Sequence, residues 1–158
     1  MEAILQVSGL QKTYDDHHVV KGISFAVDRG EVFGILGPNG AGKTTTISML
    51  SGITESTGGT IKIGSKTMKP GARDAKALIG LVPQELALYE TLSARNNLLF
   101  FGRIYGLRGK ELHRRVDEVL DLVSLTDRAH EAVAKYSGGM KRRINIDAGL
   151  LHKPEILF

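Results

Sequence analysis

The chain has 158 residues, enough for a compact core, and its 42% apolar content is ordinary for a globular protein. It has no cysteine, which excludes disulfides and thiolate metal sites, and no apolar run long enough to span a membrane. The net charge of +4 comes from scattered lysines and arginines, with no aromatic residues alternating among them, so it does not by itself indicate a nucleic-acid groove. No signal peptide begins at Met1-Glu2-Ala3, and we expect an intracellular protein.

The first third of the chain is expected to be rich in β-strands. Strand-forming residues fill segments 3–7, 19–27 and 59–63. A fourth segment, 31–36, is an apolar run that follows a turn at 28–30, and it predicts a buried strand. A further short buried strand is predicted at 79–82, ending before Pro83.

Residues 37–44 form a complete phosphate-binding loop with the pattern G-x-x-x-x-G-K-[ST], between a predicted strand and a predicted helix. Its glycines let successive backbone N–H groups point toward one anion at the positive end of the helix dipole. Lys43 is placed to reach the β- and γ-phosphates, and the Thr44 hydroxyl is placed to ligate Mg²⁺. We therefore expect binding of a nucleoside triphosphate. The expected contacts are Gly37, Pro38, Asn39, Gly40, Ala41, Gly42, Lys43, Thr44 and Thr45.

The spacing of apolar residues becomes helical from about Thr91 to Leu125. Thr91 or Ser93 is a candidate N-cap for the first helix there. One apolar stripe comprises Leu112, Val116, Val119, Leu120 and Val123. Another helix is expected after Gly139, ending before Pro154, and residues 154–158 begin a new apolar strand.

Ser137-Gly138-Gly139 stands at the start of that last helix and has two interpretations. A hydroxyl and exposed N–H groups beside a positive dipole end would form a second anion site. Alternatively, Ser137 is an ordinary N-cap followed by two flexible glycines. The residues alone favour the cap.

Together, Tyr14, the phosphate loop, Gln84, Ser137-Gly138-Gly139-Met140 and the strand after Pro154 resemble the nucleotide-binding subunit of an ATP-binding-cassette (ABC) transporter. The resemblance covers the whole chain. It implies an α/β fold with a P-loop NTPase (RecA-like) core and an N-terminal antiparallel β subdomain, together spanning about 1–90. It also implies a small helical subdomain at about 91–150, with 154–158 as the start of the Walker B strand.

The resemblance also assigns roles to single residues. Tyr14 would stack on adenine, and Val20 would pack on the base edge. Gln84 would coordinate Mg²⁺ or orient a water molecule. The signature residues Ser137, Gly138 and Gly139 would close over the γ-phosphate held by a second, head-to-tail domain. The family pattern is Leu-Ser-Gly-Gly-Gln, whereas this chain has Tyr136 and Met140 at the outer positions, which puts the glutamine's contacts in doubt.

In the family, the aspartate, glutamate and histidine that support hydrolysis come after the strand that begins at Pro154, beyond Phe158 here. Asp147 is predicted to lie mid-helix and is a poor substitute, and none of the five histidines occupies the family position. We therefore expect residues 1–158 to be the N-terminal part of a longer cassette, less stable than the whole and prone to association. We do not expect this chain alone to hydrolyse ATP efficiently.

The leading hypothesis is the ATP-binding component of an ABC transporter, using ATP and Mg²⁺ with a transmembrane permease and a second nucleotide-binding domain, peripheral on the inner face of the cell membrane. The alternatives are a nucleotide-binding module without catalysis, a nucleic-acid-linked ABC ATPase and, remotely, a P-loop kinase. Ser137 follows Gln84 by only 53 positions, too few for the coiled coil of repair members, so no direct nucleic-acid partner is expected. Leu86, Leu88 and Tyr89 would provide either local packing or a permease groove. The run at 138–143 is similar to cassettes of drug- and polysaccharide-type exporters.

Overall fold

The computed structural model describes residues 3–158, which divide into two compact units. The first comprises the residues up to Ile79 together with Phe158, and the second is Gly80–Leu157. The loop that carries Gln84 therefore belongs to the second unit, with the helices. In the described range, no helix combines the length and apolarity that crossing a membrane requires.

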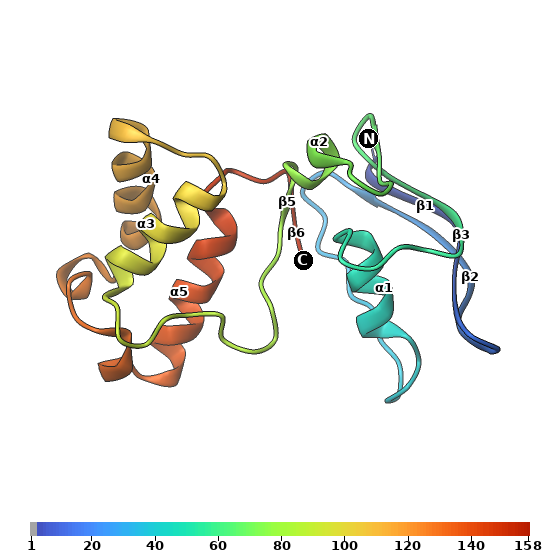
Figure 1. Ribbon diagram of the computed structural model, residues 1–158, viewed down its shortest axis with the longest axis horizontal. Coiled ribbons are helices and arrows are strands. Elements are labelled where there is room, and N and C mark those ends of the chain that lie inside the picture. The colour runs from blue at the N-terminus through green and yellow to red at the C-terminus, as the bar shows by residue number, and fades with distance from the viewer. Residues whose placement is uncertain (1–2) are drawn as a thin grey trace. The chain divides into compact units, whose positions relative to one another are not determined.

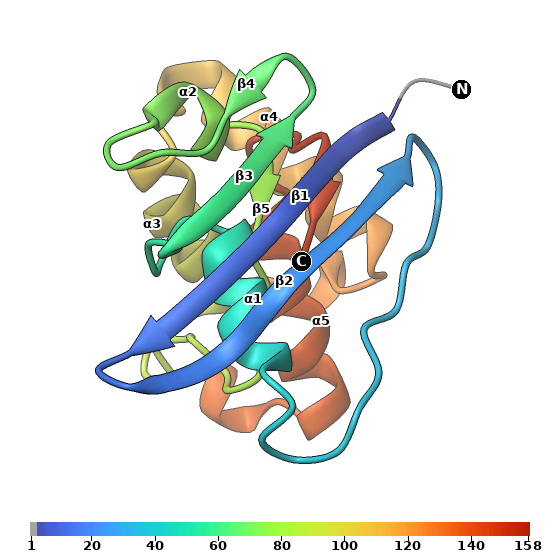
Figure 2. The same cartoon turned by 90° about the vertical axis from the view of Figure 1, so that its right-hand side faces the viewer.

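The first unit contains a four-stranded antiparallel sheet of order β2-β1-β3-β4 (Figures 1 and 2). Its strands are β1 (Ala3–Tyr14), β2 (His17–Asp28), β3 (Gly58–Ile63) and β4 (Lys66–Thr67). Buried Leu5 pairs with Ile63 and buried Val7 with Ile61, so one apolar row crosses β1 and β3. Helix α1 (Lys43–Leu50), which follows the phosphate loop, buries Met49 and Leu50, and α2 (Arg73–Lys76) is a single turn. The predicted antiparallel β subdomain is confirmed.

The predicted buried strand at residues 31–36 is wrong in this structure. The segment has no strand partner among the described residues, and Val32 and Leu36 are 99% and 94% exposed. Phe33 stacks on Phe25 of β2 with ring centroids 5.0 Å apart. An apolar run becomes a buried strand only where a neighbouring strand accepts its hydrogen bonds, and nothing within residues 3–158 supplies one. The strand predicted at 79–82 is present but shorter than expected. It comprises β5 (Ile79–Gly80), which pairs with β6 (Ile156–Leu157).

The second unit is built on three helices, α3 (Ala94–Ile104), α4 (Gly109–Leu122) and α5 (Gly138–Leu150), with 3₁₀ turns η1 (Thr126–Arg128) and η2 (Val133–Lys135). Four residues of the predicted stripe, Leu112, Val116, Val119 and Leu120, are buried in one apolar core, which also holds Leu98 of α3 and Ile144 of α5. The fifth, Val123, is the C-cap of α4 and packs partly buried against this core. Ser93 is the N-cap of α3, since its hydroxyl accepts the Asn96 amide at 3.1 Å. The periodicity and one of the two candidate caps are therefore confirmed.

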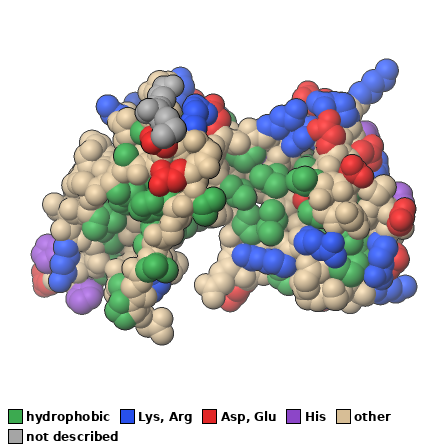
Figure 3. Space-filling view, turned by 180° about the vertical axis from the view of Figure 1, so that it is seen from behind, with side chains coloured by type: hydrophobic (Ala, Val, Ile, Leu, Met, Phe, Trp, Pro, Cys, Tyr) green, Lys and Arg blue, Asp and Glu red, His purple; other side chains and the backbone are tan. Residues whose placement is uncertain are grey.

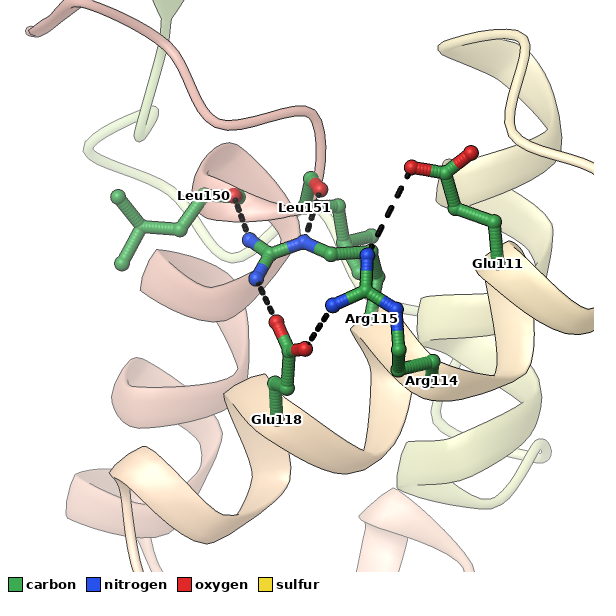
Figure 4. A network of polar contacts seen from close by, with 6 residues as sticks. All are labelled: Glu111, Arg114, Arg115, Glu118, Leu150 and Leu151. Atoms are coloured by element: carbon green, nitrogen blue, oxygen red, sulfur yellow. Dashed lines mark hydrogen bonds and ion pairs between the residues drawn. The ribbon is translucent and has the colours of Figure 1, made fainter.

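Arg115 ties α4 to the end of α5, as Figure 4 shows. Its guanidinium donates to the carbonyls of Leu150 and Leu151, both at 2.9 Å, and also pairs with Glu118. Hydrogen bonding from Arg115 lowers the pKa of the Glu118 carboxyl below its usual value. The last carbonyls of a helix lack intrahelical partners, so Arg115 acts as a C-cap supplied by a neighbouring helix.

Candidate nucleotide-binding site

The phosphate loop turns directly into α1, and its glycines are required by the backbone. Gly40 and Gly42 both adopt φ of 83°, in the left-handed region. A Cβ added at Gly42 would lie 2.8 Å from the Val19 carbonyl oxygen and 3.2 Å from Cγ2 of Val20, so only glycine fits. Gly42 is also the N-cap of α1, and no side chain caps the first turn within the described chain. The N–H groups of this turn therefore keep their hydrogen-bonding capacity for an anion.

Lys43 lies in the first turn of α1 with its side chain folded over the loop. Its ammonium donates to the carbonyl oxygens of Gly37 and Pro38, both at 2.7 Å. The Ala41 amide donates to Pro38 at 3.2 Å, which closes the turn, and Thr44 is exposed beside Lys43. A helix N-terminus, an ammonium and a hydroxyl are the donor set that suits a magnesium-complexed polyphosphate.

Tyr14, the predicted adenine contact, is the last residue of β1 and is 47% exposed. The Lys12 ammonium lies 4.7 Å from its ring centroid. Val20 is only 4% exposed, because it packs beside Gly42 inside the first unit. The contact of Val20 with a base edge stays a prediction.

Ser137 is the N-cap of α5, with its hydroxyl accepting the Met140 amide at 3.3 Å. Gly138 and Gly139 are exposed, and a Cβ at either position would meet nothing within 4 Å. The cap interpretation is confirmed, and the first turn of α5 is open to solvent. Both departures from the family pattern are core residues: Tyr136 and Met140 are buried, and the Tyr136 hydroxyl donates to the Arg128 carbonyl at 2.7 Å.

Gln84 is exposed in the loop before α3, and the sequence did not reveal what holds this loop. The Arg142 guanidinium donates to the carbonyls of Pro83 (2.8 Å) and Gln84 (3.4 Å). The Asn145 side chain accepts the Ala87 amide at 3.1 Å and donates to the Pro83 carbonyl at 3.3 Å. The sequence did contain a signal for this contact. Asn145 is a poor helix former in the interior of a predicted helix, which indicates that its side chain has a specific partner.

The apolar residues after Gln84 were predicted to provide either local packing or a permease groove, and they differ in burial. Leu88 packs against the core of the second unit. Leu86 and Tyr89 are 42% and 51% exposed, and Tyr89 contacts Phe100 edge to face, with ring centroids 5.1 Å apart. Leu86 and Tyr89 therefore remain exposed beside Phe100, and their contact with a permease stays a prediction.

The basic cluster Lys141-Arg142-Arg143 is engaged within the protein. Lys141 pairs with Glu90, and Arg143 donates to the Val123 carbonyl at 2.7 Å. On the face that Figure 3 draws, acidic side chains are interspersed among the Lys and Arg side chains. Asp147 lies in the interior of α5, as predicted, and is fully buried there. Across residues 3–158, no group of three or more His, Asp or Glu side chains is arranged to hold a metal.

The chain is similar to known proteins of one family. A family model described as "ABC transporter" matches residues 20–158. The linearmycin resistance ATP-binding protein LnrL of Bacillus subtilis (strain 168) is 52% identical over 98% of this chain and 50% of the relative. The Nod factor export ATP-binding protein I of Ralstonia nicotianae is 41% identical over 98% of this chain and 48% of the relative.

Two solved structures have the same fold. An ATP-binding subunit of an ABC transporter matches with a TM-score of 0.83 and 32% identity, over 98% of this chain and 64% of that one. The cbiO1 protein of Clostridium perfringens, part of the ABC transporter complex cbiONQ, matches with a TM-score of 0.89 and 29% identity, over 99% and 64%. The chain spans about half the length of the curated relatives it matches. On the family match and the 52% identity to LnrL, this chain is a member of the ABC transporter ATP-binding family, with the P-loop NTPase fold.

Proposed function

We propose that this chain binds Mg-ATP as part of the ATP-binding component of an ABC transporter. The observation that carries the proposal is the start of α1, where a backbone that only glycine can adopt leads into an uncapped helix N-terminus. Lys43 and Thr44 both lie in that first turn. Residues 37–45 hold the triphosphate, and Lys43 exchanges its bonds to the loop carbonyls for phosphate oxygens.

The remaining contacts are those that the family resemblance implies for each residue. Tyr14 stacks on the adenine ring from the partly exposed end of β1. The resemblance implies Thr44 and Gln84 as Mg²⁺ ligands, and each offers a side-chain oxygen of the kind that Mg²⁺ accepts. The ion would neutralise phosphate charge when bound. Ser137, Gly138 and Gly139 present the open first turn of α5 to the γ-phosphate held by a second domain of the same kind.

In a complete ATP-binding component of this kind, ATP hydrolysis drives transport by a membrane permease. Phosphoryl transfer to water also needs carboxylates that orient and polarise the water molecule, and buried Asp147 does not supply one. The protein is peripheral on the inner face of the membrane, and the exposed apolar cluster Leu86, Tyr89 and Phe100 contacts the permease. The names of LnrL and the Nod factor proteins indicate resistance and export, which favours an exporter.

Titration calorimetry with Mg-ATP tests the nucleotide site. Replacing Lys43 with alanine should weaken binding by about tenfold to a hundredfold, because a charge-assisted hydrogen bond to phosphate is lost. Lys62→Ala, at an exposed position of β3, is the matched control and should bind as the unmodified chain does. Equal affinities for the two variants, or no binding by the unmodified chain, would contradict the proposal.

A further inference from the structure

The loop that carries Gln84 is attached to helices at both ends through side chains. We call residues 83–90 the glutamine loop. At its start, Arg142 and Asn145 of α5 bind Pro83, Gln84 and Ala87. At its end, Tyr89 is bound on both backbone groups by Asn97 of α3: its amide donates to Oδ1 at 2.8 Å, and its carbonyl accepts from Nδ2 at 3.0 Å.

Asn145 bridges the loop from one side of Gln84 to the other. Its Nδ2 donates to Pro83, just before Gln84, and its Oδ1 accepts from Ala87, three residues after it. The side chain is 2% exposed, and an amide buried without hydrogen bonds would be costly. Asparagine also weakens a helix interior relative to alanine. The bonds to the glutamine loop therefore account for an otherwise unfavourable residue at this position.

Arg142 adds a second attachment from the same helix face, three residues before Asn145. It is the residue whose guanidinium reaches the Gln84 carbonyl itself. The neighbouring Arg143 makes an equivalent bond to a different part of the unit, the carbonyl of Val123. The two adjacent arginines thus differ in whether they hold the loop.

We propose that Asn145 and Arg142 are positioning residues that fix Gln84 to α5, so that Gln84 and the Ser137 end of that helix move as one body. The helix is continuous from Gly138 to Leu150, and both residues lie within its first eight positions. A ligand that displaces Gln84 therefore shifts the signature residues with it. This inference rests on the proposed function, in which Gln84 meets Mg²⁺ and Ser137 meets the γ-phosphate of a second domain.

Hydrogen exchange of single backbone amides tests the attachment in the chain as it stands, without nucleotide. Asn145→Leu should speed exchange at the Ala87 amide by about tenfold while leaving the Tyr89 amide unchanged, because one hydrogen bond is lost at one site. Asn97→Leu should produce the converse pattern. Asn96→Leu, at the exposed neighbour of Asn97, should change neither amide. Unchanged protection of Ala87 in Asn145→Leu would overturn the proposal.

Steady-state ATP hydrolysis by a complete ATP-binding component that carries these residues, assembled with its permease, tests the functional consequence. Asn145→Leu and Arg142→Met should lower kcat by about tenfold while KM for ATP stays within about twofold, because the phosphate loop is untouched. Arg142 is exposed, so its variant should fold even if Asn145→Leu does not. Arg143→Met should retain kcat.

A purely structural role would give a different result. Val116→Ala removes side-chain volume from the core of the second unit and lowers its stability without touching the loop. The positioning role is wrong if the two loop variants lose no more kcat than a Val116→Ala protein whose melting temperature falls by the same amount. It is also wrong if KM for ATP rises by the same factor as kcat falls. Absence of ATP binding by calorimetry would instead refute the proposed function, and the exchange pattern would still decide whether the attachment exists.

Discussion

Asp147 is a buried carboxyl group in α5 with no hydrogen-bond partner for either oxygen among the described residues. Burial raises its pKa from 3.8 to about 8, and the positive charge of Arg143 opposes this shift without cancelling it. The residue is therefore mostly protonated at neutral pH in the folded chain. A carboxyl group in this state cannot act as the water-polarising carboxylate that hydrolysis requires.

The pH dependence of stability should show this residue directly. Its pKa is higher in the folded than in the unfolded chain, so the folded state binds the proton more tightly. The contribution of this proton to the free energy of unfolding is complete below about pH 4 and is lost as the pH rises through about 8. Asp147→Asn should flatten this part of the profile, measured by urea unfolding at several pH values. If the unfolding free energies of the unmodified chain and the Asp147→Asn variant changed with pH in the same way, Asp147 would not be the titrating group.

At the scale of elements, the stripe of α4 was predictable because helical periodicity is local. Leu112, Val116, Val119 and Leu120 are spaced by the helix itself, and any partner surface buries them together. A strand depends on hydrogen bonds from residues distant in sequence, so the apolar run at 31–36 did not suffice. The same limit applies to the site. The phosphate-loop geometry follows from contiguous residues, whereas the bonds from Asn145 and Arg142 span about sixty positions.

The contact between α4 and the end of α5 yields an element-scale prediction. Arg115→Met removes two bonds to α5 carbonyls and leaves them without these donors, so it should lower the unfolding free energy by about 2 kcal/mol. Arg114→Met is the matched control, since Arg114 pairs with Glu118 and Glu111 at the surface. It should cost less than about 1 kcal/mol in denaturant unfolding. Equal losses for the two variants would show that the capping of α5 contributes nothing.

At the scale of the whole molecule, the exposed apolar segment at 31–36 should govern self-association. Val32 and Leu36 are almost fully exposed in a segment that has no strand partner within residues 3–158, and exposed apolar patches favour association. The double variant Val32→Lys and Leu36→Lys should shift the chain toward monomer in sedimentation velocity. Leu122→Lys, at an exposed residue of α4, should have a smaller effect. The opposite ranking would refute this origin of association.

The contact between Lys12 and Tyr14 limits how a ring can stack there. The Lys12 ammonium is held by the Glu55 carbonyl at 2.7 Å while it lies over the Tyr14 ring. A cation on one face of an aromatic ring draws π-electron density toward itself. An adenine that stacks on Tyr14, as proposed, would therefore lie on the ring face opposite Lys12, with the tyrosine between the cation and the base.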